Sequence, residues 1–401
     1  MIRLSVNFSY LKIKLFFNEK EKNNNYKKIL KLYSIAFLFI FFVVSNIFAQ
    51  DQKDQNTYQE EIKKKEIKPI YKNSLKLLPV IYYTPETHLA GGLVGIYLFK
   101  TKKDSTTRTS NIDFAAIYTQ NRQVIINPIV TMFTRNERFY LRSYFLYTEF
   151  PEFFYGIGSK GIDSTKEKIS YKALRTHQRV LTKLLPKFFG GLQYDYTNFY
   201  DLKFPNDTKY LNKLAGFEGS KSSGLGLAFQ IDMRDNILNA SKGYYMEVSN
   251  LNYGSWIGSK FNFHNYILDF RKYFQLPNKS IIAFQTYFNL NNGNVPFKQM
   301  ATIGGHTLMR GYYNGRFRDK NATVIQAEWR QHIWRRLGAT IFGGLGEVAP
   351  KAFNFYISDI KASGGVGFRF MVDKQERLNF RFDAAFGENS HGFYFNIAEA
   401  F

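Results

Sequence analysis

Cysteine is absent from this chain of 401 residues. Its absence excludes a disulfide framework and any metal site built on thiolates. Only six histidines occur, and no pair of them has the H-x-x-x-H or H-E-x-x-H spacing of a zinc site. No metal site and no cofactor are therefore expected.

Catalytic signatures are also lacking. The sequence has no G-x-S-x-G element, no phosphate-binding Walker loop and no dinucleotide fingerprint. An outer-membrane phospholipase would need a serine activated by a histidine. His264 is the candidate histidine for such a pair, and the sequence offers it no convincing serine. We therefore expect a protein that is not an enzyme.

Long hydrophobic runs are missing after the N-terminal leader. In the rest of the chain no run approaches the ~18 apolar residues of a membrane helix. Transmembrane strands alternate apolar and polar residues, so a β-barrel escapes this test. The net charge is +23, which suits an anionic membrane surface or nucleic acid. Because no DNA- or RNA-binding motif is present, nucleic acid is not expected as a partner.

The first 49 residues have the pattern of a secretory signal peptide with an extended N-terminus. A basic segment that ends at Lys31 precedes the apolar run 32–44, and a cut after Ala49 is predicted. A single anchoring helix is the alternative interpretation. Residues 50–74 are polar and charged, which predicts a flexible periplasmic tail. The chain is thus expected to be exported.

From Leu75 onward the chain consists of short alternating runs separated by turn residues, the pattern of an all-β fold. In the run 378–388, large aromatic residues alternate with charged ones such as Arg381 and Asp383. The runs are 9–12 residues long in many cases, which suits strands that cross a bilayer. Backbone groups in lipid must all be paired, so such strands have to close into a barrel.

Sixteen strands are predicted, an even number as bacterial single-chain barrels require. They are 75–83, 88–100, 110–119, 123–133, 138–157, 170–184, 186–198, 223–234, 242–254, 260–275, 278–291, 322–334, 336–346, 362–372, 378–388 and 391–401. The fold class is therefore a 16-stranded antiparallel transmembrane β-barrel over 75–401. Short links at 120–122, 134–137 and 276–277 are expected to be periplasmic turns or small loops. The long links 199–222, 292–321 and 347–361 are expected to be extracellular or lumenal.

The link 292–321, after the eleventh predicted strand, contains a conspicuous motif. It holds Gly304, Gly305, Arg310, Gly311 and Tyr312. Glycine lets the backbone turn tightly or approach another surface closely, and a long loop in a compact fold is usually functional or disordered. We expect this loop to fold into the barrel lumen and to dock there through Arg310.

The final strand ends on an aromatic residue. Phe393, Phe395, Ile397 and Phe401 are expected to share one face, with Glu399 at the level of the lipid headgroups. A terminal aromatic on an amphipathic last strand is typical of the sorting signal of outer-membrane barrels. The localisation expected is the outer membrane, with its lipid as a partner.

Four stretches resemble the barrel of the outer-membrane assembly-factor superfamily, the bacterial surface-antigen group that includes BamA and TamA. The first is the strand pair with Asp232, Arg234, Asp235, Asn236 and Gly243, similar to D-x-R-D-N…G-[WY]. The others are the glycine-arginine loop around Arg310, the following strand with Glu328, and the closing strands from Gly365 to Phe401. The resemblance covers 75–401.

The resemblance implies a partner for the loop arginine. In the family, a glutamate in the barrel wall and an aspartate one strand later hold it. Glu328 matches the glutamate and shares an inward face with Val324, Gln326, Arg330 and His332. Gly344 stands where the aspartate is expected. Arg310 is therefore expected to dock less tightly or to use another lumenal carboxylate.

The resemblance also implies a function: insertion, assembly or translocation of proteins at the outer membrane. Family members carry periplasmic POTRA domains that receive client chains, and 50–74 is too short for one. The expected partners are client outer-membrane proteins, with periplasmic proteins or lipoproteins in place of the POTRA domains. A passive pore or a structural surface barrel is the alternative function.

Overall fold

The structure, a computed structural model, describes residues 72–401 except 85–87, 102–106, 121, 162–165, 205–212 and 353. The expected signal peptide 1–49 and nearly all of the expected tail 50–74 lie outside these described residues. The part of the chain from Ile70 to Phe401 forms one compact unit.

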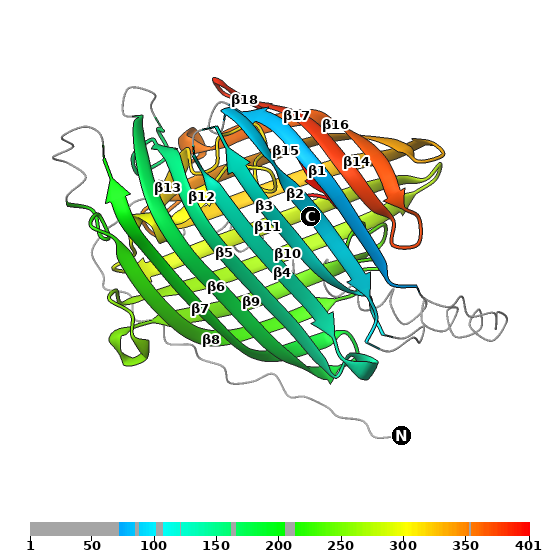
Figure 1. Ribbon diagram of the computed structural model, residues 1–401, viewed down its shortest axis with the longest axis horizontal. Coiled ribbons are helices and arrows are strands. Elements are labelled where there is room, and N and C mark those ends of the chain that lie inside the picture. The colour runs from blue at the N-terminus through cyan, green and yellow to red at the C-terminus, as the bar shows by residue number, and fades with distance from the viewer. Residues whose placement is uncertain are drawn as a thin grey trace, which may run out of the picture. The chain divides into compact units, whose positions relative to one another are not determined.

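Sixteen strands form one antiparallel sheet in which each strand pairs with the next along the chain (Figure 1). The first eight are β1 (Ser74–Thr84), β2 (His88–Phe99), β3 (Ser110–Thr119), β4 (Val124–Phe133), β5 (Phe139–Phe154), β6 (Glu167–Leu185), β7 (Phe188–Lys203) and β8 (Ser220–Asp232). The next eight are β9 (Gly243–Tyr253), β10 (Phe263–Leu276), β11 (Ser280–Gly293), β14 (Asn321–Trp334), β15 (Leu337–Ala349), β16 (Lys361–Asp373), β17 (Leu378–Gly387) and β18 (Ser390–Ile397).

The remaining elements are small. Strands β12 (Ala301–Ile303) and β13 (Phe317–Asp319) form a separate hairpin between β11 and β14. The helices described are single 3-10 turns, named η1 (Arg135–Glu137), η4 (Ser255–Ile257), η5 (Phe297–Gln299) and η6 (Ile357–Asp359). In the part of the chain that the structure describes, no helix is long and apolar enough to cross a membrane. The predicted all-β fold is confirmed.

The polar and apolar residues that alternate in the sequence lie on opposite faces of the sheet. On β17, Arg381 and Asp383 are buried, whereas Phe382 and Phe386 are 46% and 57% exposed. Successive side chains of a strand point to opposite faces, so a polar, buried face lies behind an apolar, exposed one. Large exposed apolar side chains recur on most strands of the sheet. This arrangement reverses that of a water-soluble β-protein.

The chain order divides the connections between two ends of the sheet. Because each strand runs opposite to its predecessor, consecutive connections lie at alternate ends. One end, here called the turn end, has the short β4–β5, β6–β7, β10–β11 and β14–β15 connections; the loop end has the long ones before β8, β14 and β16. The link 120–122 follows β3 and lies at the loop end. It therefore lies opposite links 134–137 and 276–277, so of the two predicted alternatives, periplasmic turn or small loop, it cannot share the periplasmic side with them.

The two edge strands are β1 and β18. Side chains connect the two edges of the sheet: Lys76 Nζ on β1 lies 3.5 Å from Asp373 Oδ2 on β16. Leu98 on β2 packs in one apolar cluster with Leu378 on β17. The sheet therefore curls far enough for its beginning and its end to come into contact.

The chain end departs from its predicted place. β18 stops at Ile397, and Ala398 has a positive φ of 67° that turns the backbone out of the strand. Phe401 is buried against Ala240 and Tyr273, while Phe393 is 72% exposed. The prediction that Phe401 shares the face of Phe393, Phe395 and Ile397 was wrong. Buried arginines on neighbouring strands bind Glu399 and the Phe401 backbone, and these contacts replace the regular strand.

Candidate functional site

The segment 294–320, between β11 and β14, packs onto the polar face of the sheet. Its β12–β13 hairpin contributes Ile303 and Phe317 to an apolar cluster, together with Met309 and Tyr312. Val324 on β14 and Val348 on β15 complete this cluster from the sheet side. Gly304, Gly305 and Gly311 all have positive φ, between 94° and 113°, which favours glycine. These turns bring the intervening residues onto the sheet.

Arg310 lies at the centre of this packing and is almost fully buried. Its Nη1 donates to Asp383 Oδ2 at 2.6 Å, and its Nη2 donates to Glu328 Oε1. Its guanidinium lies over the Phe342 ring, 3.5 Å from the ring centroid. The planar guanidinium thus joins carboxylates of two strands, β14 and β17, which lysine cannot reproduce.

Further arginines extend the contact into a network. Arg330 Nε lies 2.8 Å from Glu328 Oε2, and Arg369 Nη1 lies 2.7 Å from Asp383 Oδ1. Arg381 Nη1 also reaches Asp383 Oδ2, at 3.1 Å. These residues are all buried, and a buried charge is tolerated only with partners. The loop arginine therefore belongs to a network that spans β14, β16 and β17.

Gly344 shows why the second partner of Arg310 comes from β17. Gly344 pairs with Gln326 in the β14–β15 register. A Cβ at this position would lie 3.1 Å from Met309 Sδ and 3.1 Å from Gln326 Cβ. The glycine leaves room for the loop's methionine, while Asp383 supplies the carboxylate. Sequence reasoning placed Asp383 on a polar strand face, but no local signal linked it to Arg310.

Residues on either side of Arg310 bind backbone groups. The Gly311 N–H donates to the Tyr394 hydroxyl at 3.0 Å. The Tyr312 hydroxyl donates to the Ala362 carbonyl at 2.7 Å and accepts from the Glu388 N–H at 2.9 Å. The structure therefore brings Gly311, Arg310 and Tyr312 together against β14, β16, β17 and β18. His306 lies in the same segment, where burial, with repulsion from Arg381 and Arg310, lowers its pKa to about 4.

A second ionic contact holds the same segment at the loop end. The carboxylate of Glu152 on β5 binds Lys298 Nζ, lies 3.5 Å from Arg318 Nη2, and accepts from the Tyr171 hydroxyl at 3.0 Å. Burial lowers the pKa of Lys298 to about 8, although Glu152 acts against the shift. Sequence reasoning missed this cluster, because its residues are far apart in the chain and belong to no motif.

The strand-pair motif lies at the turn end, where it shapes the β8–β9 connection. Asp232 binds both Arg234 Nε and Arg108 Nη1, at 2.8 Å each. Asn236 Oδ1 accepts from two backbone N–H groups that follow it in the turn. Gly243 has a φ of 98°, and a Cβ there would lie 2.1 Å from the Met233 carbonyl oxygen. These motif residues therefore fold a connection and do not contact the Arg310 network.

Asp235 of the same motif joins two connections. It accepts from the Ser241 N–H at 2.9 Å and binds Arg377 Nη2 at 2.8 Å, in the β16–β17 connection. Burial opposes the charged carboxylate, but the Ser241 hydrogen bond and Arg377 outweigh it and lower the pKa of Asp235.

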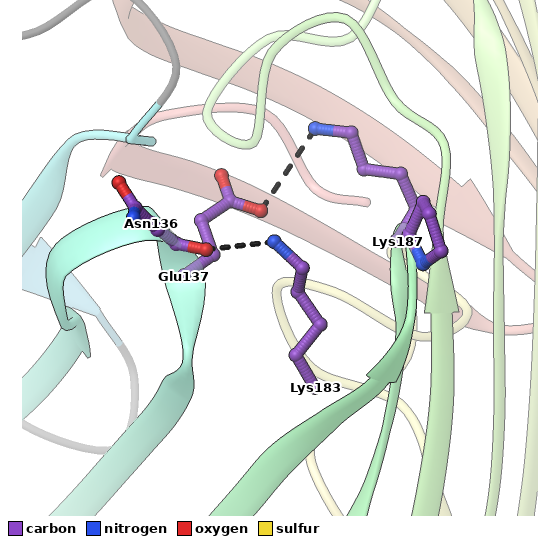
Figure 2. Close-up of a pocket in the computed structure, with 5 residues that line it drawn as sticks. Asn136, Glu137, Lys183 and Lys187 are labelled. Atoms are coloured by element: carbon purple, nitrogen blue, oxygen red, sulfur yellow. Dashed lines mark hydrogen bonds and ion pairs between the residues drawn. The ribbon is translucent and has the colours of Figure 1, made fainter.

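A shallow pocket opens beside this region, lined by residues of the β4–β5 and β6–β7 connections (Figure 2). Lys183 Nζ donates to the Asn136 carbonyl at 2.7 Å, and Lys187 Nζ lies 3.9 Å from Glu137 Oε2. Figure 2 shows both ammonium groups directed toward the same turn. Two lysines therefore line the pocket, and one of them, Lys187, faces the Glu137 carboxylate.

Catalytic and metal-binding candidates do not assemble. His264 Nδ1 contacts Asn252 Oδ1 at 2.7 Å, on an exposed stretch of β10. Among the described residues, no group of three or more His, Asp and Glu side chains could hold a metal ion.

Asp383 is expected to carry much of the network's stability. Asp383→Asn keeps the size of the side chain but removes the charge shared by three arginines, so we expect a loss of about 2–4 kcal/mol in unfolding free energy. Guanidinium unfolding of the folded protein in lipid vesicles measures this loss. Asp201→Asn, at an exposed ion pair, is the control and should change stability by less than about 0.5 kcal/mol. Equal midpoints for both variants would contradict the assignment.

Comparison with known proteins decides the family. The Omp85 superfamily domain matches residues 189–401, which is more than half of the chain. The chain belongs to the Omp85 superfamily. This match includes the Arg310 loop, Glu328, Asp383 and the β8–β9 motif, so the resemblance found in the sequence is confirmed. No match is found among curated proteins.

Solved structures show the same fold as this Omp85 chain. BamA from Haemophilus ducreyi lacking POTRA domains 1-3 matches with a TM-score of 0.53 and 13% identity, over 81% of this chain and 70% of that one. CdiB from Escherichia coli matches with a TM-score of 0.54 and 9% identity, over 82% of this chain and 63% of that one. CdiB from Acinetobacter baumannii matches with a TM-score of 0.51 and 10% identity, over 81% and 59%.

Family and fold both point to the outer membrane. The chain spans less than two thirds of each CdiB chain. No POTRA-like region lies in the part of the chain that the structure describes, since that part consists of the single large sheet and its connections.

Proposed function

We propose that residues 75–401 form a closed, 16-stranded barrel in the outer membrane, with segment 294–320 folded into its lumen. Side-chain contacts between the first and the last strands of the sheet support closure. Lys76 on β1 pairs with Asp373 on β16, and Leu98 on β2 packs with Leu378 on β17. The apolar outer face supports a position in lipid, because only a closed sheet satisfies its backbone groups there.

The barrel's proposed role is to aid the insertion, assembly or translocation of proteins at the outer membrane. The observation that carries this proposal is the buried Arg310, which joins the 294–320 segment to Glu328 and Asp383 within the Omp85 match. The seam between β1 and β18 also supports it. Closure there rests on side-chain contacts, because in the described residues each of the two strands has a single hydrogen-bonded neighbour, which makes the seam weak. Incoming strands can pair with such an edge by β-augmentation.

Other predictions follow the same proposal. Residues 1–49 direct export and 50–74 form a periplasmic tail, and Phe393, Phe395 and Ile397 on β18 act in sorting together with Phe401. Client outer-membrane proteins are the proposed substrates, and periplasmic proteins or lipoproteins are proposed as further partners. No reaction chemistry is needed for this role, so we propose that the chain is not an enzyme.

Depletion of the protein from its cells tests the role. We expect the folded amounts of other outer-membrane barrels to fall, measured by quantitative proteomics of isolated outer membranes. Expression of the intact chain from a plasmid should restore them. Unchanged amounts of all other barrels would reject the assembly function. A large, steady ion conductance of the purified protein in planar bilayers would instead favour the passive pore.

A further inference from the structure

Exposed basic side chains gather at the turn end of the sheet. Six of them define what we call the basic rim: Arg135, Arg138, Lys183, Lys279, Arg335 and Arg336. Within the described part of the chain, none of the six forms an ion pair with a carboxylate. The acidic side chains described at this end already have a cation or a hydroxyl as partner. The positive charge of the rim therefore faces outward without compensation.

The loop end also carries exposed cations that have no carboxylate partner among the described residues, including Lys213, Lys221, Lys260 and Lys351. Exposed acidic and basic side chains occur there together, for example Glu218 beside Lys221.

The backbone of the turns gives a second, independent indication. Lys187, Lys279, Arg335 and Arg377 have positive φ values of 63°, 58°, 49° and 52°. Glycine and asparagine adopt this left-handed conformation more easily than long side chains do. Among the described residues of the loop end, Arg122 is the one basic residue with positive φ. Lys187 and Arg377 bind Glu137 and Asp235 there. Lys279 and Arg335 have no carboxylate partner among the described residues, although asparagine would suit their backbone better, which indicates a role other than folding.

Exposed apolar side chains lie directly beside the rim. Leu184 and Leu185 follow Lys183 and are 49% and 63% exposed. The Arg335 guanidinium lies over the Trp334 ring, 4.4 Å from its centroid, and Trp334 is itself 57% exposed. Cations next to aromatic and aliphatic groups are typical of the boundary between lipid chains and headgroups. Apolar side chains beside the cations suit contact with a lipid leaflet, whereas the binding of an acidic soluble protein would not require them.

We propose that the basic rim binds the phosphate groups of anionic phospholipids in the leaflet that the turn end faces. Lys183, which lines the pocket of Figure 2, offers an ammonium donor to one such headgroup. The rim thereby sets the depth of the barrel in the bilayer and concentrates anionic lipid around the turns. The inference rests on the membrane-spanning barrel proposed above and does not depend on its role in protein insertion.

Lipid selectivity of the folded full chain tests the proposal. Spin-labelled phosphatidylglycerol and phosphatidylcholine are compared by electron paramagnetic resonance for their association with the protein in phosphatidylcholine bilayers. We expect the intact protein to favour phosphatidylglycerol by about twofold or more. The preference should weaken in high salt, because charged surface contacts are screened.

The decisive variant combines Lys183→Gln, Lys279→Asn, Arg335→Asn and Arg336→Gln, and its selectivity should fall to about one. The two asparagines suit the left-handed backbone, so the melting temperature should stay the same or rise. The smaller variant Lys279→Asn with Arg335→Asn should lose part of the preference. A loss of selectivity without a loss of stability would exclude a purely structural role.

The matched control removes the same charge at the loop end, through Lys213→Gln, Lys221→Gln, Lys260→Gln and Lys351→Gln. This variant should keep the preference for phosphatidylglycerol. The proposal is overturned if the control loses the preference as fully as the rim variant, or if the intact protein shows none. Neither result bears on whether cells need the protein for barrel assembly, so the two proposals fail separately.

Discussion

Arg310→Ala is expected to lower the unfolding free energy by about 3–5 kcal/mol, the usual cost of removing one partner of a buried ion pair. The substitution leaves Glu328 and Asp383 buried with one cation fewer and opens space beside Phe342. Guanidinium unfolding in lipid vesicles, followed by tryptophan fluorescence, measures the loss. The folding yield, read from heat-modifiable migration in gels, should fall with it.

Two variants show which property of Arg310 matters. Arg310→Lys keeps the charge but reaches a single carboxylate, so its loss should lie between those of the intact protein and Arg310→Ala. Glu328→Gln should reproduce part of the loss, since Asp383 still binds the guanidinium. Arg135→Ala, at an exposed turn, serves as the control and should leave stability within about 0.5 kcal/mol. Unchanged unfolding of Arg310→Ala and Glu328→Gln would show that the network does not stabilise the barrel.

Gly311→Ala is expected to displace the 294–320 segment from β17, at a cost of about 2–4 kcal/mol. Gly311 has a φ of 110°, and a Cβ there would lie 2.7 Å from the Phe386 carbonyl carbon and 2.8 Å from its oxygen. Because these are backbone atoms of a paired strand, they cannot move aside as a flexible side chain would. The segment should then become accessible, and trypsin should cleave at Arg310, Arg316 or Arg318.

Gly258→Ala separates the clash from backbone strain. Gly258 also has a positive φ, 84°, but a Cβ there would have no atom within 4 Å. Its cost should be limited to about 1–2 kcal/mol of local strain, without new cleavage in 294–320. Equal effects for Gly258→Ala and Gly311→Ala would mean that the close approach to Phe386 does not hold the segment in place.

The order and type of the strands could be read from the sequence. The runs 322–334 and 378–388, for example, overlap β14 and β17 almost residue for residue. The signal is local, because apolar and polar side chains alternate at adjacent positions and turn residues interrupt this alternation. The same alternation put Glu328 and Asp383 on the buried face. Fold class and the faces of the strands were therefore accessible without coordinates.

The partners of buried charges were less accessible. The Glu152–Lys298 contact joins positions 146 residues apart, and the Arg310–Asp383 contact joins positions 73 apart. Neither separation follows from a pattern along the chain. From the sequence, Gly344 was interpreted as the loss of one partner of Arg310. The sequence does not reveal that Met309 occupies the space beside this glycine.

By itself, the sequence determined an all-β chain with alternating faces, a glycine-rich loop carrying a buried arginine, and the family of the barrel. Only the tertiary structure decided that Asp383 binds Arg310, that Glu399 and Phe401 turn inward after β18, and that the residues of the basic rim gather at the turn end. The physical reason is the difference in range. Side-chain alternation depends on adjacent residues, whereas ion pairs form wherever the curled sheet brings distant strands within a few ångströms.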